Sequence, residues 1–591
     1  MNNLRNRKIK IWVSCLSLLC VILLFVAAAN ITAKNADTQE TKRMKPATQA
    51  ADLQQDTQPA SAITEDPNLF EQLAAEAQDT LQHQQAVDES LLGELDSHAY
   101  TWDNPLIITD PYGQSPLAAL ALFETNEAAQ ISVSISGKTR IADVAFTFPG
   151  YNTRHVIPIY GLYADSENQV VLTADTAGGQ KEQTLSIRTE PLPGWLADLN
   201  IITRLSLPES YTAGFNFTYQ PKSAYDANGD FRWYFSDFDL LRTNSDCENG
   251  RMIVAKGSTL MGAALLYEVD LLGRVYNIYY SPYGVHHDIV QTDDGTLLIT
   301  GSDSGSDQKG QVFNMVYELN PADGKIINTL DLSTVLQRTR ANNTVYWPHD
   351  WFHNNSIVAL EGSKILVSGR HQSAVVKLDW PSGEIDWILS APEGWNELFH
   401  PYLLQPVGSG FEWQVCQHTP TLLPDLDNNS DTTDILLLDN GTNRVTGNDE
   451  PQRQTDNPGQ YSRAVHYRID EKAGTVEQIW QFGKELGSTY YSERCGNAMR
   501  LENGSVFISF DVSQEIDLAD RDPLTIYSNA CVEVLENGDI VWESYLSNRA
   551  SGSGSYENFK TTRRSFYGDA EGEYPLDNIP GYFVPEQEAT V

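Results

Sequence analysis

The chain has 591 residues, which favours two or three domains over one, and its formal net charge is −39. Hydrophobic residues make up 41% of it and twelve residues are Trp, which is enough for sizeable buried cores. So negative a charge excludes nucleic acid as the expected partner, because phosphate binding needs clustered Lys and Arg. An anionic small substrate would be repelled at long range, so an anion site requires a local concentration of positive charge or hydrogen-bond donors.

Cysteine usage is sparse, with six in the chain. Two of them lie in an apolar N-terminal segment, and no CxxC pair occurs among the other four, which leaves a zinc cluster without support. Four cysteines allow three pairings, and the sequence does not choose among them; the four are Cys247, Cys416, Cys495 and Cys531.

The N-terminus carries an export signal. Residues 11–29 are almost wholly apolar and follow a basic segment, residues 1–10. This apolar run is just long enough to span a bilayer, with its basic end inside. It is either an uncleaved signal anchor or a signal peptide cleaved after Ala27 to Ala29. Either reading of residues 1–30 predicts an exported protein, in the periplasm or another extracytoplasmic compartment, with the membrane contacted only through this segment.

Composition then divides the chain in order. Residues 31–97 read as a disordered tether followed by one or two helices, which start near Pro67. Residues 98–195 change to short β runs separated by turn signals such as Pro149-Gly150, which predicts a small β-sandwich domain.

From residue 196 to 591 one hairpin pattern occurs six times: a strand, a polar residue, a turn closed by Gly, and a second strand. Repeated four-stranded units of this kind predict an all-β fold with a six-bladed β-propeller. Residues near Phe559 to Tyr567 are candidates for a late strand that closes the ring against the first blade. The six turn glycines are Gly229, Gly273, Gly324, Gly383, Gly474 and Gly538.

A second repeat places a polar residue at the head of a short strand, and its four copies begin at His287, Asn355, His418 and Asn497. The innermost strands of a propeller line its channel, so these heads should converge from four blades into one ring. For a single His, a structural hydrogen bond at a strand start is the equally good alternative. His286, His353 and Arg370 lie close by in sequence, and three His, one Arg and one Asn would make a local anion site.

Several longer motifs carry a family resemblance. They are His286 to Ile289, Trp351 to Ile357, Ser368 to Val375, Gln417 to Thr419, and Asp439 to Gly441 with Arg444. From about Asn104 to the C-terminus the chain resembles the bacterial arylsulfate sulfotransferases, which do not use the phosphoadenylyl sulfate donor.

The resemblance implies ping-pong transfer of a sulfuryl group from an aryl sulfate donor to a phenolic acceptor through a sulfated histidine. By motif, His418 is similar to the family nucleophile, and His353, Asn355 and Arg370 to residues that hold the sulfuryl oxygens. The His286-His287 pair supplies another, and the repeat favours His287. We expect His286, Asn497, Arg444 and Trp351 to contribute to substrate binding.

One departure from the family concerns a disulfide. Relatives have two closely spaced cysteines just before the nucleophile motif, whereas here only Cys416 is close. That disulfide is therefore absent, or is remade with a distant cysteine such as Cys495.

The chemistry of the residues agrees with the resemblance. A neutral imidazole nitrogen is a good nucleophile near pH 7, and the planar guanidinium of Arg370 suits paired sulfate oxygens. The acceptor phenol, with a pKa of about 10, needs a base, for which a neighbouring His is the candidate. No cofactor and no metal are expected.

Alternatives remain at this point. The chain is otherwise a non-catalytic exported propeller that binds a partner, or a metal enzyme with His ligands, although Arg370 would repel the metal. A second copy of the chain, in a homodimer, is a further candidate partner. Residues Asp425 to Asp431 alternate oxygen ligands as a calcium loop does, but without its central Gly and terminal Glu, so an acidic loop is the favoured interpretation.

Overall fold

The structure, a computed structural model, describes residues 67–219, 222–236, 244–246, 250–257, 264–302, 313–337, 350–442, 444, 459–511, 514–515, 526–548, 558–568 and 570–576. The expected signal segment (residues 1–30), the tether before residue 67, and Cys247 lie outside these residues. Within them, no helix is both long enough and apolar enough to cross a membrane.

One long helix, α2 (Pro67–Asp96), precedes the strands, as the sequence predicted. It is fastened through two polar side chains. Gln84 exchanges two hydrogen bonds with the backbone of Val275, and Asp88 forms a buried ion pair with Arg274 at 2.9 Å. The other helices of the described residues are short: α3 (Gly194–Ala197), η1 (Arg140–Ala142), η2 (Pro208–Ser210), η4 (Leu332–Thr334), η5 (His400–Tyr402) and η7 (Lys484–Tyr490), which is kinked at Gly487.

The predicted short β runs after residue 98 form one antiparallel, six-stranded assembly built around β2 (Ala119–Ile135). The first half of β2 pairs with β1 (Leu106–Thr109) and β4 (Asn152–Ile159). Its second half pairs with β3 (Val144–Thr147) and β5 (Glu167–Thr176), and β5 continues to β6 (Gly179–Arg188). The first five residues of β2, Ala119 to Phe123, are wholly buried.

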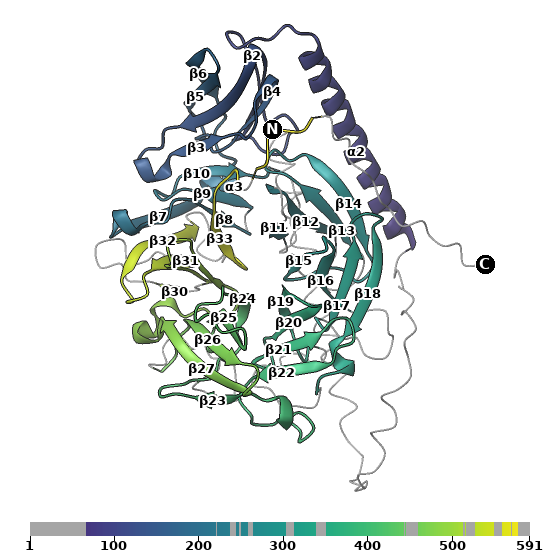
Figure 1. The fold of residues 1–591 in the computed structure, drawn as a ribbon, viewed down its shortest axis with the longest axis vertical. Helices are drawn as coiled ribbons and strands as arrows, with labels where there is room; N and C mark the ends of the chain where they lie inside the picture. Colours follow the sequence, from purple (N-terminus) through teal and green to yellow (C-terminus); the bar gives the residue numbers. More distant parts are fainter. Residues whose placement is uncertain are drawn as a thin grey trace, which may run out of the picture. The chain divides into compact units, whose positions relative to one another are not determined.

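Six further sheets follow one another around a common centre (Figure 1). The first contains β8 (Phe215–Thr218), β9 (Ser223–Tyr225), β10 (Phe231–Tyr234) and β33 (Thr561–Arg564). The second contains β11 (Asn244–Asp246), β12 (Met252–Gly257), β13 (Ala264–Val269) and β14 (Val275–Ser281). The third contains β15 (Ile289–Gln291), β16 (Leu297–Gly301), β17 (Met315–Asn320) and β18 (Lys325–Asp331).

The fourth sheet contains β19 (Asn354–Leu360), β20 (Lys364–Gly369), β21 (Ala374–Asp379) and β22 (Ile385–Leu389). The fifth contains β24 (His418–Leu422), β25 (Thr432–Asp439), β26 (Arg463–Asp470), β27 (Thr475–Phe482) and β23 (Gln405–Val407). The sixth contains β28 (Asn497–Arg500), β29 (Val506–Phe510), β31 (Ile526–Val534) and β32 (Ile540–Asn548), with β30 (Gln514–Glu515) on β31 and β7 (Leu199–Leu205) on β32.

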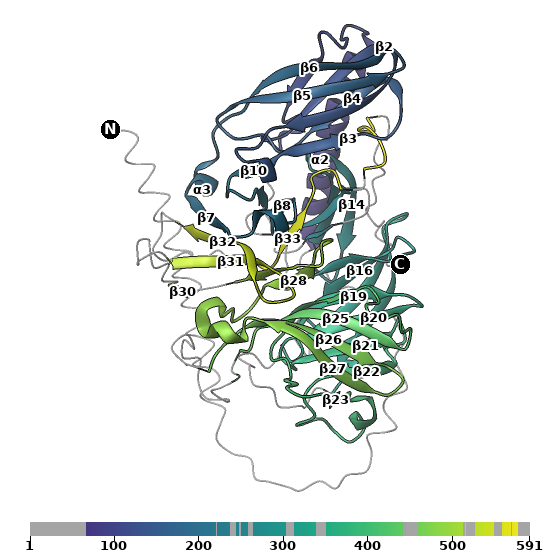
Figure 2. The same ribbon diagram turned by 60° about the vertical axis from the view of Figure 1, so that its left-hand side comes forward.

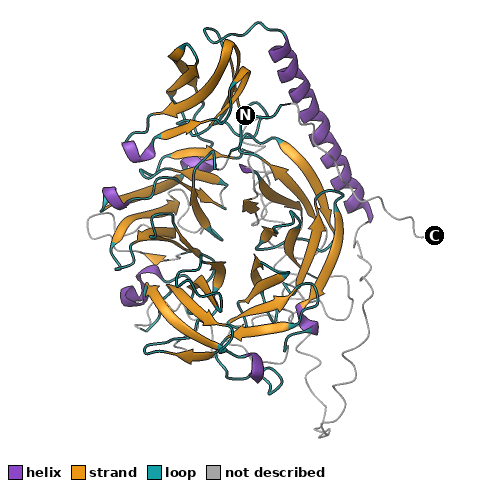
Figure 3. Ribbon diagram, viewed as in Figure 1, coloured by secondary structure: helices purple, strands orange, loops and turns teal. Residues whose placement is uncertain are grey.

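These strands dominate the described chain and confirm the all-β class (Figure 3). All six predicted Gly-closed hairpins are antiparallel strand pairs. Their glycines all have positive φ, from 66° to 89°, a backbone conformation that residues with a Cβ rarely adopt. The predicted inner strands also form, with His418 the first residue of β24 and Asn497 the first of β28.

A late strand, β33, returns to the first of the six sheets, as predicted for residues near Phe559 to Tyr567. β33 pairs antiparallel with β8, and β7 pairs with β32 in the sixth sheet (Figure 2). Arg563 of β33 forms an ion pair with Glu533 of β31, and both side chains are almost wholly buried. The guanidinium also lies 4.5 Å from the ring centre of Trp542.

We predict that Glu533→Gln lowers the free energy of unfolding by about 3 kcal/mol, because Arg563 is then left as an uncompensated buried charge. Asp165→Asn is the comparison: it breaks the ion pair of Asp165 with Arg188, in which both side chains are more than half exposed. This change should lower the free energy of unfolding by less than about 1 kcal/mol. Urea titrations of the two variants make the comparison, and equal losses would contradict a closure that depends on this pair.

Candidate active site

His418 lies at the head of β24 with only 1% of its surface exposed, and its hydrogen bonds define its tautomer. Its Nδ1 lies 2.7 Å from Oδ1 of Asn440. The amide nitrogen of Asn440 donates to two backbone carbonyls, of Ser492 and Cys495, so the amide oxygen must face the histidine and accept. The proton of His418 therefore sits on Nδ1, and Nε2 keeps its lone pair, with the backbone N–H of Cys495 donating to it at 3.3 Å.

Burial keeps this imidazole neutral. It lowers the pKa of His418 to about 3, and the positive charge of Arg370 adds to the effect. Nε2 of His418 is thus unprotonated across the physiological pH range.

A pair of adjacent histidines, His286 and His287, precedes β15. Nε2 of His286 donates to the carbonyl of Gly301 at 2.9 Å, so its Nδ1 accepts from Nδ1–H of His287 at 2.9 Å. Nε2 of His287 is then the unprotonated nitrogen of that ring. Burial lowers the pKa of His286 to about 3, so His286 acts as a neutral support and His287, which is half-buried, is the member of the pair that a substrate can reach.

Aromatic rings connect the histidines across the sheets. The ring centres of His287 and His353 are 4.8 Å apart, and Phe313 lies within 5.2 Å of both. Phe559 lies 5.3 Å from His287 and 6.1 Å from His418. Phe559 thus contacts a histidine before β15 and another at the head of β24, whereas the sequence predicted one ring of four strand heads, His287, Asn355, His418 and Asn497.

Arg370 follows β20 and is largely buried. Its Nη1 donates to Nε2 of His371 at 2.9 Å, and its Nη2 donates to the carbonyl of Glu493 at 3.3 Å. Both partners are neutral. Within the described ranges no carboxylate oxygen lies within 4.0 Å of the guanidinium, and its Nε is buried with no hydrogen-bond partner among the same residues.

Other buried arginines differ in this respect, because each is paired with a carboxylate: Arg232 with Asp226, Arg274 with Asp88, Arg444 and Arg463 with Asp439, and Arg563 with Glu533. Arg370 has no such direct partner among the described residues, although the carboxylate of Asp350 acts on its charge from a longer distance. Arg370 lies close to His418, because one loop, Glu493 to Cys495, contacts both side chains.

Asn355 supports the strand that carries His418. Its Nδ2 donates to the carbonyl of Gln417 at 2.8 Å, and its Oδ1 is buried with no partner in the described part of the chain. The second N–H of Nδ2 is the donor of this side chain that suits an anion.

The local backbone at the site is irregular. The residues His287, His353, Cys416 and Cys495 all have positive φ, between 49° and 60°, just before four successive inner strands. Bulges interrupt the pairing of β19 after Asn354 and of β24 after His418. Left-handed residues and bulges re-aim side chains and gather at functional sites.

Three residues predicted to bind substrate, Asn497, Trp351 and Arg444, contact other parts of the protein. Asn497 exchanges two hydrogen bonds with the backbone of Thr561, and so ties β28 to β33. Trp351 packs in an apolar cluster with its ring 5.2 Å from Phe352. Arg444 bonds to Asp439 and to the carbonyl of Trp413.

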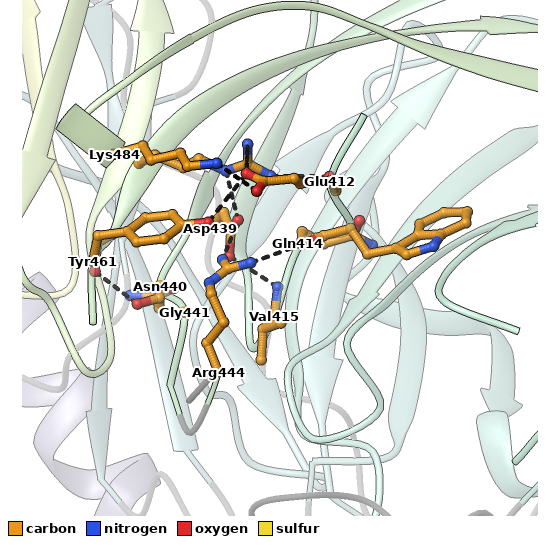
Figure 4. A network of polar contacts seen from close by, with 12 residues as sticks. Glu412, Gln414, Val415, Asp439, Asn440, Gly441, Arg444, Tyr461 and Lys484 are labelled. Carbon is orange, nitrogen blue, oxygen red and sulfur yellow. Dashed lines mark hydrogen bonds and ion pairs between the residues drawn. The ribbon is translucent and has the colours of Figure 1, made fainter. Parts of the chain in front are cut away.

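Arg444 belongs to a network of ion pairs and hydrogen bonds that surrounds Asp439 (Figure 4). Burial alone would raise the pKa of Asp439, but Arg444 and Arg463 hold it below its usual value. The carboxylate of Asp439 also accepts the backbone N–H of Val415 at 2.8 Å. Since Asp439 precedes Asn440 and Val415 lies three residues before His418, this network fixes the two chain segments that bring the amide to the imidazole.

Cys416, Cys495 and Cys531 are all buried and form no disulfide with one another, so the pairing of Cys416 with Cys495 that the sequence had left open is not formed. The acidic loop from Asp425 to Asp431 is exposed, and the carboxylates of Asp425 and Asp427 accept backbone N–H groups within the loop.

One group of side chains has the make-up of a metal site. The ligand atoms of Asp350, His353 and His371 lie within 4.8 Å of one another. Each is engaged in a hydrogen bond, however: Nδ1 of His353 with Oδ2 of Asp350 at 2.6 Å, and Nδ1 of His371 with the Asp350 carbonyl at 2.6 Å. Arg370 occupies the other nitrogen of His371, and a divalent cation here would lie beside that positive charge.

Sequence reasoning did not assign roles to Asn440, His371, Phe313 or Phe559. Asn440 and His371 stand within the motifs that carried the family resemblance, which was the available signal. The two phenylalanines had none, because they come from loops outside the repeats.

Comparison with known families places the chain. A family model described as Arylsulfotransferase (ASST) matches residues 201–543, and another, Arylsulfotransferase Ig-like domain, matches residues 106–190. The first match covers more than half of the chain, which therefore belongs to the arylsulfotransferase family. It is an aryl sulfotransferase that is independent of the phosphoadenylyl sulfate donor, as the motifs predicted.

Two curated relatives agree, both called arylsulfate sulfotransferase AssT. The protein of Escherichia coli O6:H1 is 24% identical over 69% of this chain and 86% of its own length. That of Lelliottia amnigena is 24% identical over 65% of this chain and 81% of its own length. Among solved structures, a putative 6-phosphogluconolactonase from Bacteroides fragilis is 8% identical, with a TM-score of 0.30 over 74% of this chain and 98% of that one.

We predict that acid destabilises the protein through His286 and His418. Their pKa in the folded chain, about 3, lies below the unfolded value of about 6.5, so the unfolded state takes up protons first as the pH falls. The free energy of unfolding should drop by about 1.4 kcal/mol per histidine per pH unit below pH 6, until the pH approaches 3.

Urea titrations at pH 7, 6 and 5 measure this slope. Replacing both His286 and His418 by Asn should reduce the slope by about 2.8 kcal/mol per pH unit. It should leave the part that comes from His353, His371 and His466, whose pKa burial also lowers. The exposed His98→Asn should leave the slope unchanged. An undiminished slope after the double replacement would contradict the buried neutral state.

Proposed function

We propose that the chain transfers a sulfuryl group from an aryl sulfate ester to a phenolic acceptor by a ping-pong mechanism, with His418 as the sulfated intermediate. The observation that carries the proposal is the pairing of an unprotonated Nε2 on His418 with the positive charge of Arg370. Nucleophile and anion site meet on one loop.

In the first half-reaction, the lone pair of His418 Nε2 forms a bond to sulfur, the bond from sulfur to the aryl oxygen breaks, and the phenolate leaves. The nucleophilic nitrogen needs no base, because its proton is already held on Nδ1 by Asn440. When the lone pair of Nε2 attacks, the N–H of Cys495 leaves Nε2. It then donates, together with Arg370, to the sulfuryl oxygens, where charge accumulates in the transition state.

In the second half-reaction, the acceptor hydroxyl gives its proton to a histidine base while its oxygen bonds to sulfur. The N–S bond breaks and its electron pair returns to Nε2 of His418. His353 and His287 are the candidate bases, because both are partly accessible and lie against Phe313, whose ring suits an aryl substrate.

We further infer that the six sheets are the blades of a β-propeller (residues 196–591) and that residues 98–195 form a β-sandwich domain. The order of the sheets around one centre and the pairing of β33 with β8 support this arrangement. The apolar segment 11–29 supports export to the periplasm, which fractionation of cells producing the full chain would test.

The protein without its apolar segment 11–29 should release nitrophenol from 4-nitrophenyl sulfate rapidly only when phenol is present. Protein treated with the donor alone should be heavier by one SO3, carried on the His418 peptide. His418→Asn should lose both label and transfer while its circular dichroism spectrum is unchanged. Equal rates with and without phenol would identify a sulfatase. A folded His418→Asn variant that still transfers would overturn the assignment.

Arg370→Lys should lower kcat/KM by about 10²-fold, because lysine keeps the charge but loses the planar fork that spans two oxygens. The exposed Arg188→Lys is the matched control and should retain full activity. Near-normal turnover of Arg370→Lys would show that only long-range charge matters at this position.

A further inference from the structure

Asp350 joins two side chains of the proposed site. Its Oδ2 lies 2.6 Å from Nδ1 of His353, and its backbone carbonyl accepts from Nδ1–H of His371 at 2.6 Å. His371 then accepts from Nη1 of Arg370 at 2.9 Å. The four groups form one buried chain of hydrogen bonds, from the guanidinium to His353.

The protonation states along this chain follow from the donors. Arginine only donates, so Nε2 of His371 must be unprotonated and its proton must be on Nδ1. Burial lowers the pKa of His371 and keeps it neutral. It therefore fixes the plane of the guanidinium without cancelling its charge, which a carboxylate in the same place would do.

At the other end, the carboxylate accepts from Nδ1–H of His353, which leaves Nε2 of His353 as the nitrogen open to a substrate. The same contact stabilises positive charge on His353 when Nε2 takes up a proton. Burial lowers the pKa of His353, and the neighbouring His371 and the positive charge of Arg370 lower it further. The carboxylate of Asp350 at Nδ1 is the group that opposes this effect when the ring takes up a proton.

We propose that Asp350 and His371 are positioning residues of the transfer reaction: Asp350 orients His353 as the base for the acceptor phenol, and His371 orients Arg370 while leaving its charge available to the sulfuryl group. This inference rests on the proposed function. In the step concerned, the acceptor O–H proton goes to His353 Nε2, the oxygen forms the O–S bond, and the N–S bond to His418 breaks.

The roles separate by half-reaction. Asp350→Asn keeps an oxygen that accepts from His353 but removes the negative charge. Formation of the sulfo-enzyme from 4-nitrophenyl sulfate uses no base, so its single-turnover rate should change by less than about 10-fold. Desulfation by phenol at pH 8 should slow by about 10²-fold or more, the usual contribution of a general base. Desulfation by 4-nitrophenol, already ionised at pH 8, should slow far less.

Conservative and control variants complete this test. Asp350→Glu should recover part of the phenol rate, and the exposed Asp165→Asn should change neither step. Equal slowing of Asp350→Asn with phenol and 4-nitrophenol, or no slowing with either, would overturn the role of Asp350. A stoichiometric metal in the purified parent that is lost from Asp350→Asn would replace the inference with a metal site at Asp350, His353 and His371.

His371 is tested by charge. His371→Gln supplies another neutral acceptor and should retain both half-reactions within about 10-fold, whereas His371→Glu should slow both by about 10²-fold by neutralising Arg370. Should the Glu variant not fold by circular dichroism, His371→Phe, which removes the acceptor, replaces it with the same expected loss. Equal activity of Gln and Glu, or of Gln and Phe, would overturn the role of His371.

The failure of this inference is distinguishable from the failure of the proposed function. If the parent protein never acquires a label on the His418 peptide, the proposed function fails. If the parent is labelled and the variants show none of the expected differences, only the roles of Asp350 and His371 fail.

Discussion

The hydrogen bond between Nδ1 of His418 and the side-chain oxygen of Asn440 determines what this site can do. It holds the proton on the nitrogen away from the substrate, and so leaves Nε2 ready to attack. The bond has only one sense, because the amide nitrogen of Asn440 is already committed to the carbonyls of Ser492 and Cys495. The buried ions around Asp439 extend this constraint to the backbone on either side (Figure 4).

Charge is managed in opposite ways in two neighbouring regions. Arg444 and Arg463 share the carboxylate of Asp439, and Arg463 also pairs with Glu412, so both arginines serve as structural connections. Arg370, by contrast, donates to a neutral histidine and a backbone carbonyl among the described residues. A buried charge without a carboxylate partner lowers the stability of the fold, but it attracts anions locally inside a strongly acidic protein. The left-handed residues at the heads of the inner strands are a further strain that the packed sheets sustain.

Much of this organisation could be predicted from the sequence because it repeats. Six turn glycines marked six hairpins, and polar residues at the heads of inner strands marked His287 and His418 as neighbours. At Asn497 the repeat position has a further use, since its side chain bonds to the backbone of Thr561 in the closing strand β33. Arg444 and Trp351 were grouped with the site because they share its motifs, yet a motif does not reveal which way a side chain points. The roles of Asn440 and His371 depend on donors and acceptors supplied by distant loops, such as Ser492 and Cys495, which no local pattern discloses.

The most direct test of the account is a rapid-mixing measurement with 4-nitrophenyl sulfate and no acceptor. A covalent sulfohistidine at His418 predicts a burst of one nitrophenol per protein molecule, after which release stops until phenol is added. Direct transfer from donor to acceptor would give no burst, and an enzyme that activates water would continue to release nitrophenol at a steady rate. Either of these results would contradict a covalent intermediate on His418.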